Sequence, residues 1–461
     1  MTTFSESPAL AELRQRLPAD SLVTDTDLME SYRTDRAMFC DAGMPLAVVR
    51  ARSTADVAAT MEVASEYGVP VVPQGARSGL SGGANAIDGC FVVSLEAMDQ
   101  IVNIDRANHF VVTQPGVFNA VLARAVAEQG LFYPPDPSSK EFCSIGGNLS
   151  TNSGGLCCVK YGVTTDYVLG LEVVLASGEI LRTGRTTVKG VAGYDLARLF
   201  VGSEGTLGII TEATLRLRGA AERPKTLAAT FADATHAALA VSAIVASRMV
   251  PSLLEFMDRI SVQAVNDRFQ LGFDDTVDAV ILAQSDAGGL AGEAEIHAIA
   301  TILRATGAVD VVVAESDQEA EALLTARREV LTAFEAMGTT MVDDVCVPRD
   351  RLAELVAGIE KISVRSGLTI GVVGHAGDGN FHPAVVFDSS DDDEAKRAHT
   401  AFDEVMLLGL ELGGTITGEH GVGLLKRELL VTEIGELSLR VHRDIKNALD
   451  PAGILNPGKI F

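Results

Sequence analysis

The chain has 461 residues, 47% of them hydrophobic, and a formal net charge of −25 at pH 7. Its length exceeds what a single compact core accommodates, so two or three domains are expected. The apolar fraction is typical of a globular protein and argues against long disordered regions. The acidic charge argues against nucleic acid and anionic lipid as partners, because both require clustered Lys and Arg. The negative charge does not exclude a small anionic substrate, because one buried Arg can make the local electrostatic potential positive.

The cysteines and the N-terminal residues indicate in which cellular compartment the protein is expected. Six cysteines occur without any CxxC spacing, which favours reduced thiols over a disulfide framework. The first residues do not combine a basic region with an apolar run, and no apolar run reaches the roughly 20 residues of a membrane span. The sequence therefore predicts no secretory signal and no transmembrane segment. The expected location is cytoplasmic, with peripheral association at the inner membrane as an alternative.

The first half of the chain predicts a β-rich domain with glycine-rich turns. Helical patterns cover residues 9–16 and 25–33, and Ser53 begins a helix that ends near Gly68. Strands are expected at 46–49 and 69–73, and the second runs directly into a glycine-rich loop at 75–83. Further strands are predicted at 91–95, 110–113, 168–176, 179–183 and 208–217. The charged, proline-containing stretch 218–225 is a plausible domain boundary.

After residue 225 the pattern changes to apolar strands alternating with alanine-rich helices. Strands are predicted at 226–231, 253–257, 278–284 and 309–313, and helices at 233–249, 260–269 and 291–306. Repeating units of this size indicate an antiparallel sheet covered by helices on one side. The tail returns to helix from about residue 424.

Four glycine clusters indicate a large phosphate-containing ligand. They lie at 75–83, 145–148, 152–155 and 202–208. Glycines let backbone N–H groups approach a phosphate and permit the positive φ angles of an anion-binding concavity. A single cluster would usually be an ordinary turn, but four within 135 residues favour a dinucleotide. The first domain lacks the GxGxxG of NAD(P)-binding Rossmann folds. The tail resembles a Walker A motif, but it has no Ser or Thr after Lys459 and no following helix.

Two short segments near the C-terminus carry the candidate chemistry. They read GHAGDGNFHP at 374–383 and GGTITGEHGVG at 413–423. Two imidazoles and a carboxylate can hold a divalent metal with open positions for a substrate, and His420 is then free to move a proton. On one straight strand His375 and His382 would face opposite sides, but a break at Gly377–Gly379 can redirect the second ring. Asp378 is either a partner that orients an imidazole or a turn residue.

The combined motifs resemble a known family. They are PQG at 73–75, PPDP at 134–137, IGGN at 145–148, GSEGTLG at 202–208, the two histidine segments and LNPGK at 455–459. From about residue 20 to its end, the chain resembles the FAD-dependent D-2-hydroxy-acid dehydrogenases of the vanillyl-alcohol-oxidase flavoprotein superfamily. Within that family it looks most like the cytochrome-linked D-lactate dehydrogenases.

This resemblance implies an α+β fold. A two-subdomain FAD-binding domain is expected at 1–222, with the C-terminal segment 424–461 returning to it. A substrate or cap domain is expected at 223–423, formed by an antiparallel sheet covered by helices and carrying the metal site.

The resemblance also assigns roles to residues. It implies a divalent metal, zinc or manganese, on His375, His382 and Glu419, with His420 as the base and Arg327 holding the substrate carboxylate. FAD is expected to be non-covalent, because the loop 73–83 offers no His or Cys for attachment. The implied cofactor-binding residues are Pro73, Gln74, Gly75, Ala76, Arg77, Ser78, Gly79, Pro137, Gly146, Gly147, Asn148, Ser153, Gly154, Gly155, Glu204, Gly205, Ile210 and Asn456.

The implied reaction is oxidation of D-lactate, or of a related small D-2-hydroxy acid, by hydride transfer to the flavin. TAR at 325–327 and DVCVP at 344–348 resemble the D-lactate enzymes, while Val342 stands where the 2-hydroxyglutarate enzymes carry a lysine. Leu324 departs from the Trp that is common in the family. The alternatives are a glycolate or D-2-hydroxyglutarate dehydrogenase, a flavoprotein that uses the fold without the metal, and a non-catalytic flavin- or metal-binding subunit of an oxidase complex. The expected electron acceptor is a cytochrome, a quinone or an electron-transfer flavoprotein.

Overall fold

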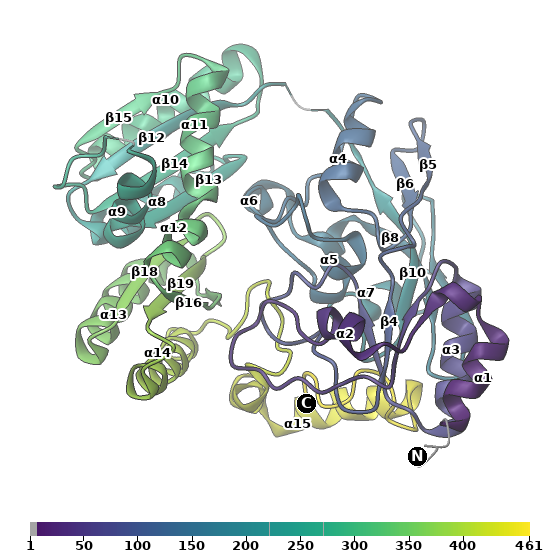
Figure 1. Cartoon of the computed structure of the whole chain (residues 1–461). Coiled ribbons are helices and arrows are strands. Elements are labelled where there is room, and N and C mark those ends of the chain that lie inside the picture. Colours follow the sequence, from purple (N-terminus) through teal and green to yellow (C-terminus); the bar gives the residue numbers. More distant parts are fainter. Residues whose placement is uncertain (1–6, 221, 271) are drawn as a thin grey trace. The chain divides into compact units, whose positions relative to one another are not determined.

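The computed structural model describes residues 7–220, 222–270 and 272–461, and within these ranges the chain divides into two compact units (Figure 1). The first unit comprises the described residues up to Ser153, together with Val163–Ala220 and Glu419–Phe461. The second unit comprises Gly154–Gly162 and the described residues from 222 to Gly418. Both units combine helices with sheets, so the predicted α+β class is confirmed. In the described ranges no helix is both long and apolar enough to cross a membrane.

The first sheet of the first unit has the strand order β1-β2-β4-β3. Its strands are β1 (Leu22–Val23), β2 (Ala47–Arg50), β4 (Phe91–Ser94) and β3 (Val71–Gln74), and β2 and β3 both run parallel to β4. Helix α3 (Thr54–Tyr67) joins β2 to β3 and packs on α1 (Pro8–Arg16). It begins at the predicted Ser53, which forms a capping box with Asp56, and ends at Gly68 with φ 66°.

The second sheet of this unit is antiparallel, with the order β5-β6-β10-β8-β9. The strands are β5 (Ile101–Asp105), β6 (Phe110–Thr113), β10 (Ile209–Arg216), β8 (Val168–Val174) and β9 (Ile180–Gly184), and a small pair joins β7 (Leu131–Phe132) to β11 (Arg218–Gly219). Helices α4 (Asn119–Ala127), α5 (Ile145–Thr151) and α7 (Leu196–Phe200) complete the unit. The segment expected to be one helix at 25–33 is instead a short α2 (Thr26–Met29) followed by a 3₁₀ turn (Glu30–Tyr32).

The C-terminal segment returns to the first sheet, as the resemblance implied. Helix α15 (Arg427–Leu449) is interrupted at Gly435, where φ is 76°. The chain then runs beside β3: the N–H of Val71 donates to Ile454 O at 2.7 Å, and the N–H of Asn456 donates to Val71 O at 2.7 Å. Leu455 is fully buried in the core formed by α1, α3 and this sheet.

The second unit is built on an antiparallel sheet with the order β15-β12-β14-β13-β18-β19-β16, and β17 also pairs with β19. The strands are β12 (Lys225–Phe231), β13 (Leu253–Asp258), β14 (Ala279–Ser285), β15 (Asp310–Val313), β16 (Thr339–Val342), β17 (Val345–Cys346), β18 (Thr369–His375) and β19 (Asn380–Phe387). The helices are α6 (Cys158–Tyr161), α8 (Ala234–Ala246), α9 (Arg259–Phe269), α10 (Gly289–Ala305), α11 (Asp317–Arg328), α12 (Val330–Met337), α13 (Leu352–Ser366) and α14 (Asp392–Glu411).

Helices cover both faces of this sheet, so the expectation that they cover one side is wrong. Successive residues of a strand point to opposite faces, and every residue of β14 is buried. Val280 and Leu282 of β14 pack in one core cluster with Val262 and Val265 of α9. The alternate residues of β14 face the other way and are equally buried, and α8 and α10 also contact this strand.

Candidate functional site

The hairpin β18–β19 places His375 and His382 on one face of the sheet in the second unit. Val373 lies directly opposite His382 across the two strands, so their side chains share a face. His375 is two residues beyond Val373 on the same strand and therefore also points to that face. The two imidazole rings lie with centroids 5.1 Å apart and planes at 83°. On a single straight strand the spacing of the two histidines would place their side chains on opposite faces. They share a face because they lie on two neighbouring strands of the hairpin.

The turn between the two histidines has a structural explanation. The N–H groups of Asp378 and Gly379 both donate to His375 O, at 3.0 and 3.1 Å. Gly379 has φ 83°, and a Cβ atom there would lie 2.2 Å from Val347 O. Only glycine fits this position without displacing Val347, the residue that follows β17. Asp378 therefore lies in a turn, as one of the two roles that the sequence left open requires.

Glu419 follows a loop that is held against the same sheet. The carboxylate of Asp344 accepts hydrogen bonds from the hydroxyl of Thr417 at 3.0 Å and from the N–H of Gly418 at 2.7 Å. A Cβ atom on Gly418 would lie 2.4 Å from Asn380 Oδ1, so glycine lets the loop lie directly on β19. The second unit ends at Gly418, and Glu419 is the next residue along the chain.

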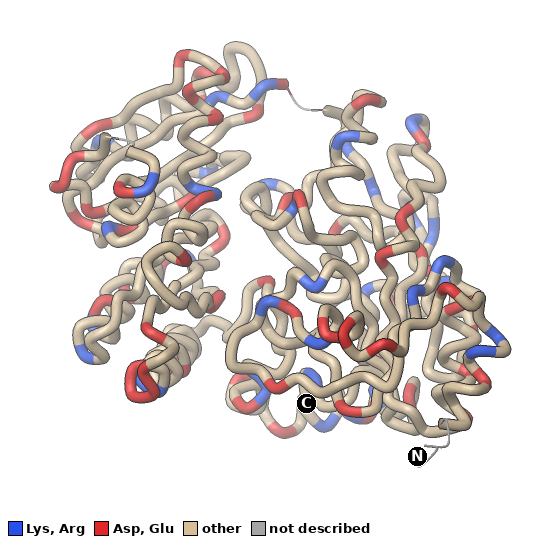
Figure 2. The backbone as a smooth tube through the Cα atoms, in the orientation of Figure 1, with Lys and Arg blue, Asp and Glu red and all other residues tan. Residues whose placement is uncertain are grey.

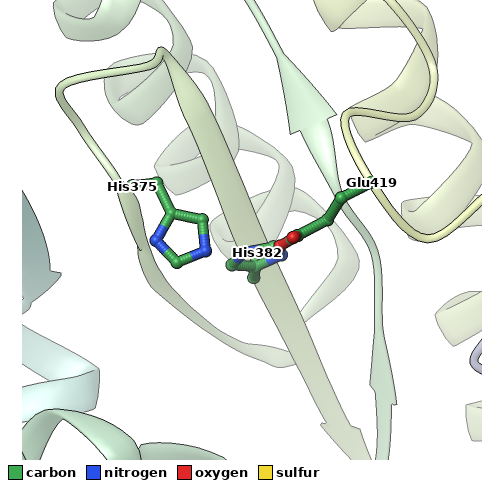
Figure 3. Close-up of side chains that lie close together, drawn as sticks. All are labelled: His375, His382 and Glu419. Carbon is green, nitrogen blue, oxygen red and sulfur yellow. The ribbon is translucent and has the colours of Figure 1, made fainter. Parts of the chain in front are cut away.

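The three predicted metal ligands lie together (Figure 3). His375, His382 and Glu419 each offer one ligand atom, and these atoms lie within 4.8 Å of one another. Two imidazole nitrogens and one carboxylate oxygen suit a divalent cation of the zinc or manganese type and leave coordination positions open for another ligand. The donor set therefore fits the metal that the resemblance implied.

A buried carboxylate that the sequence analysis missed joins two site residues. Glu255 lies in β13, is fully buried, and accepts hydrogen bonds from His375 Nδ1 at 2.8 Å and from Arg327 Nε at 2.7 Å. Burial alone would raise the pKa of Glu255, but its interactions with His375 and Arg327 outweigh burial and lower the pKa below its ordinary value. Glu255 is therefore an ionised acceptor. A charged residue inside the apolar run LLEFM was the signal that could have identified it.

Arg327 is buried near the end of α11, with 4% of its surface exposed. Its Nε atom donates to Glu255. Within the part of the chain that the structure describes, its Nη2 atom is buried and has no hydrogen-bond partner. A buried guanidinium with an unused donor is suited to bind a carboxylate. Leu324, one turn earlier, is buried in the α9 core cluster, so the helix packs without the Trp that is common in the family.

In the first unit, two of the predicted cofactor-binding clusters come together. The hydroxyl of Ser144 accepts hydrogen bonds from the N–H groups of Ala76 at 3.3 Å and Gly147 at 3.2 Å. A Cβ atom on Gly75 would lie 2.4 Å from the same hydroxyl. The loop after β3 therefore lies against the start of α5. The Ser144 hydroxyl thus brings two glycine-rich backbones together, and closely spaced backbone N–H groups of this kind suit a phosphate.

Other predicted cofactor-binding side chains hold the loops of this unit in place. The amide of Gln74 donates to Tyr32 O at 2.8 Å and to Ala84 O at 2.7 Å. The amide of Asn456 donates to Gly83 O at 2.9 Å and to Glu204 O at 2.7 Å. Arg77, at φ 54°, forms an ion pair with Glu96 at 2.9 Å.

The remaining predicted cofactor residues are distributed over both units. Ile210 is buried in β10, and the cluster 153–155 is divided, since Ser153 belongs to the first unit and Gly154 and Gly155 to the second. Pro73, Ser78, Gly79, Pro137, Gly146, Asn148 and Gly205 all belong to the first unit.

The loop that follows Glu419 is held within the first unit. The carboxylate of Glu204 accepts hydrogen bonds from the N–H groups of Val422 at 2.8 Å and Gly423 at 2.9 Å. The hydroxyl of Ser81 donates to the carbonyl oxygen of His420 at 3.0 Å. Burial raises the pKa of Glu204 to about 7. The backbone of the predicted base is therefore fixed by two residues from glycine clusters.

Comparison with known proteins decides the family. Residues 220–460 match the family model of FAD linked oxidases, C-terminal domain, and residues 45–184 match that of an FAD binding domain. The chain belongs to the FAD-linked oxidase family. This FAD-linked flavoprotein oxidoreductase therefore contains an FAD-binding domain, as the sequence predicted.

Relatives of the FAD-linked oxidase cover almost the whole chain. Glycolate oxidase subunit GlcD of Bacillus subtilis is 44% identical over 91% of this chain and 89% of its own length. Glycolate oxidase subunit GlcD of Escherichia coli K12 is 35% identical over 98% of this chain and 90% of its own length. D-lactate dehydrogenase of Anaerostipes hadrus is also 35% identical, over 98% of this chain and 97% of its own length. These relatives support the family but do not separate the two substrates.

Solved structures confirm the predicted superfamily fold. A substrate-bound p-cresol methylhydroxylase matches with a TM-score of 0.81 and 17% identity, covering 98% of this chain and 96% of the other. An alkyldihydroxyacetonephosphate synthase matches with a TM-score of 0.76 and 19% identity, covering 98% of this chain and 86% of the other. Identities this low establish the fold alone.

Proposed function

We propose that this FAD-linked oxidase converts a small 2-hydroxy acid into the 2-oxo acid, with glycolate as the first candidate substrate and D-lactate as the second. The observation that carries the proposal is the buried group Arg327–Glu255–His375 beside His382 and Glu419. This group combines a hydrogen-bond donor for the substrate carboxylate with side chains that can bind a metal ion. The sequence motifs favoured D-lactate, but the 44% identity to a protein named glycolate oxidase subunit supports the glycolate alternative better.

The proposed roles follow from the chemistry of the residues. FAD, when bound, supplies a hydride acceptor, and a divalent cation on His375, His382 and Glu419 makes a hydroxyl group easier to deprotonate. Arg327 binds the substrate carboxylate through Nη2 and so restricts which C2 hydrogen can be transferred. His420 accepts the hydroxyl proton, because an imidazole titrates near neutral pH.

We also propose that FAD is bound non-covalently by the first unit. The loop 73–79 and the start of α5 would surround its phosphates, with the remaining predicted residues, from Pro137 to Asn456, completing the site. The division of roles between an FAD-binding domain at 1–222 with 424–461 and a substrate domain at 223–423 is part of the same proposal.

A second candidate function is that of a flavin-binding subunit of a larger oxidase. Two of the relatives are named as subunits, which supports an assembly but says nothing of this chain's own activity. We also propose that the reduced flavin passes its electrons to a cytochrome, a quinone or an electron-transfer flavoprotein.

Anaerobic titration of the purified yellow protein tests these functions. Glycolate, D-lactate, L-lactate and D-2-hydroxyglutarate are added separately, and the flavin absorbance is followed. We expect glycolate and D-lactate to bleach the flavin within seconds to minutes. A protein that holds FAD but is reduced by none of these acids would contradict the enzymatic proposal and favour the subunit without independent activity.

A further inference from the structure

Glu255 contacts two residues of the site at once, although they lie far away in the sequence. One carboxylate oxygen, Oε1, accepts a hydrogen bond from His375 Nδ1 at 2.8 Å, and the other, Oε2, accepts one from Arg327 Nε at 2.7 Å. Their exposed fractions are 0% for Glu255, 3% for His375 and 4% for Arg327. A carboxylate removed from water this completely is costly unless both oxygens are paired. Here each oxygen has a separate partner.

The contact between Glu255 and His375 determines which nitrogen of the imidazole ring can bind a metal. A carboxylate can only accept, so Nδ1 must carry the hydrogen, and in a neutral imidazole the lone pair is then on Nε2. The sheet determines this geometry. Met257 lies opposite Val373 across the antiparallel strands β13 and β18. Glu255, two residues before Met257, and His375, two residues after Val373, therefore lie on the same face. His375 can therefore not turn away without losing a buried charged acceptor.

The contact with Arg327 fixes the plane of the guanidinium. The group is planar and its donors have fixed directions, so holding Nε also sets the direction of Nη2. In the described part of the chain, Nη2 is buried without a partner. An ion pair that used every N–H group of the arginine would be explained by burial alone, but Glu255 takes only the Nε hydrogen and leaves the two N–H groups of Nη2 unused.

We propose that Glu255 is a shared positioning residue: one oxygen holds His375 as the tautomer whose Nε2 lone pair can bind the metal, and the other holds Arg327 so that Nη2 can bind the substrate carboxylate. The proposal rests on the proposed function, because it assigns Glu255 a role toward that metal and that substrate. It also explains why a charged side chain interrupts the apolar strand β13.

Binding of Mn²⁺ alone to the metal-stripped protein tests the first half of the proposal. Free Mn²⁺ is measured by electron paramagnetic resonance for the wild type and for Glu255→Gln. We expect the dissociation constant to rise about 10–100-fold, as for other residues that orient a metal-bound histidine. The matched control is Asp258→Asn on the same strand, since Asp258 caps α9 through the N–H of Ser261 at 2.9 Å and Asn also caps helices. Its Mn²⁺ affinity should stay within about threefold of the wild type.

A double variant keeps the test informative if Glu255→Gln does not fold. That single change leaves the charge of Arg327 buried and unpaired, whereas replacing both partners is usually tolerated. Glu255→Gln combined with Arg327→Met should show the same loss of Mn²⁺ affinity. Arg327→Met alone should keep Mn²⁺ binding but raise the KM for glycolate. Glu255→Gln at saturating Mn²⁺ should also raise this KM.

The outcomes separate the two proposals. Unchanged Mn²⁺ affinity in Glu255→Gln or in the double variant would overturn the role of Glu255, and so would an equal loss in Asp258→Asn. A wild-type protein that binds Mn²⁺ but oxidises none of the tested acids would contradict the proposed function instead. A wild-type protein with no measurable Mn²⁺ affinity would overturn both.

Discussion

The carboxylate of Glu204 accepts a hydrogen bond from the backbone N–H of Val422 at 2.8 Å, across 218 residues of sequence. Its second oxygen accepts from the N–H of Gly423 at 2.9 Å. Glycine is required nearby, because Gly421 has φ 87° and a Cβ atom there would lie 2.9 Å from the Glu204 carboxylate. A residue of the GSEGTLG motif therefore fixes the loop that carries His420.

The stability of the protein should depend on the protonation of Glu204. Burial raises its pKa from 4.5 to about 7, so between these pH values the folded protein holds a proton that the unfolded chain has released. The contribution of Glu204 to the free energy of unfolding is fully present below pH 4.5 and decreases as the pH rises to about 7. At about 1.4 kcal/mol for each pH unit, the loss is about 3 kcal/mol.

Thermal unfolding of the wild type and of Glu204→Gln at pH 5, 6, 7 and 8 measures this effect. The unfolding midpoint of the wild type should fall by more than that of the variant between pH 5 and 7, by about 2–4 °C for each kcal/mol. Glu179→Gln, which removes an exposed carboxylate between β8 and β9, is the control and should follow the wild type. Parallel curves for the wild type and Glu204→Gln would show that Glu204 does not titrate in this range.

Asp344→Ala should weaken metal binding without removing a ligand. Asp344 holds the hydroxyl of Thr417 and the N–H of Gly418, and Glu419 is the next residue. Loss of these bonds frees the loop, and we expect the affinity for Mn²⁺ to fall about tenfold, since hydrogen bonds to charged groups contribute about 1.5–3 kcal/mol each. Asp391→Ala is the matched control, because Asp391 accepts two N–H bonds at the start of α14, away from the site. Equal losses in both variants would point to general destabilisation.

His382→Ala should deplete the metal while FAD is retained. Two remaining ligands cannot define the coordination geometry, so most of the affinity is lost. His297→Ala, on the exposed side of α10, provides the control for replacing an imidazole. The measurement is metal content by elemental analysis together with the flavin absorbance. Full metal occupancy in His382→Ala would refute the predicted ligand set.

The sequence predicted the local features of this site better than its long-range contacts. The helix start at Ser53 and the break at Gly377–Gly379 could be predicted, because capping and turn signals act over a few residues. The contacts of Glu255 could not, because its partners are 72 and 120 residues away and only the fold brings them together. The coverage of both sheet faces could have been predicted from the sequence, since β14 is apolar at consecutive positions rather than at alternate ones.

Acid precipitation should release the yellow chromophore into the supernatant. The loop 73–83 contains no His or Cys to which a flavin could be attached covalently, so denaturation should leave FAD free. Colour that stays with the precipitated protein would contradict non-covalent binding.

The last prediction concerns the substrate. Val342 lies opposite Ala384 across β16 and β19, and Ala384 is two residues from His382 on the same strand. The three side chains therefore share one face of the sheet, and Val342 packs in the apolar cluster on that face. A substrate with a distal carboxylate would bring an unpaired charge to this region.

We therefore expect glycolate and D-lactate to reduce the flavin much faster than D-2-hydroxyglutarate, and D-lactate faster than L-lactate. A buried unpaired charge costs several kcal/mol, and at about 1.4 kcal/mol for each factor of ten the preference is roughly a thousandfold. Val342→Lys should raise kcat/KM for D-2-hydroxyglutarate about 10–100-fold, since a charged hydrogen bond contributes about 1.5–3 kcal/mol. Thr340→Lys places the same charge on the same face, one residue pair further from His382, and should have little effect. If D-2-hydroxyglutarate were the faster substrate of the wild type, the interpretation of Val342 would be wrong, whereas the fold and the FAD-binding domain would be unaffected.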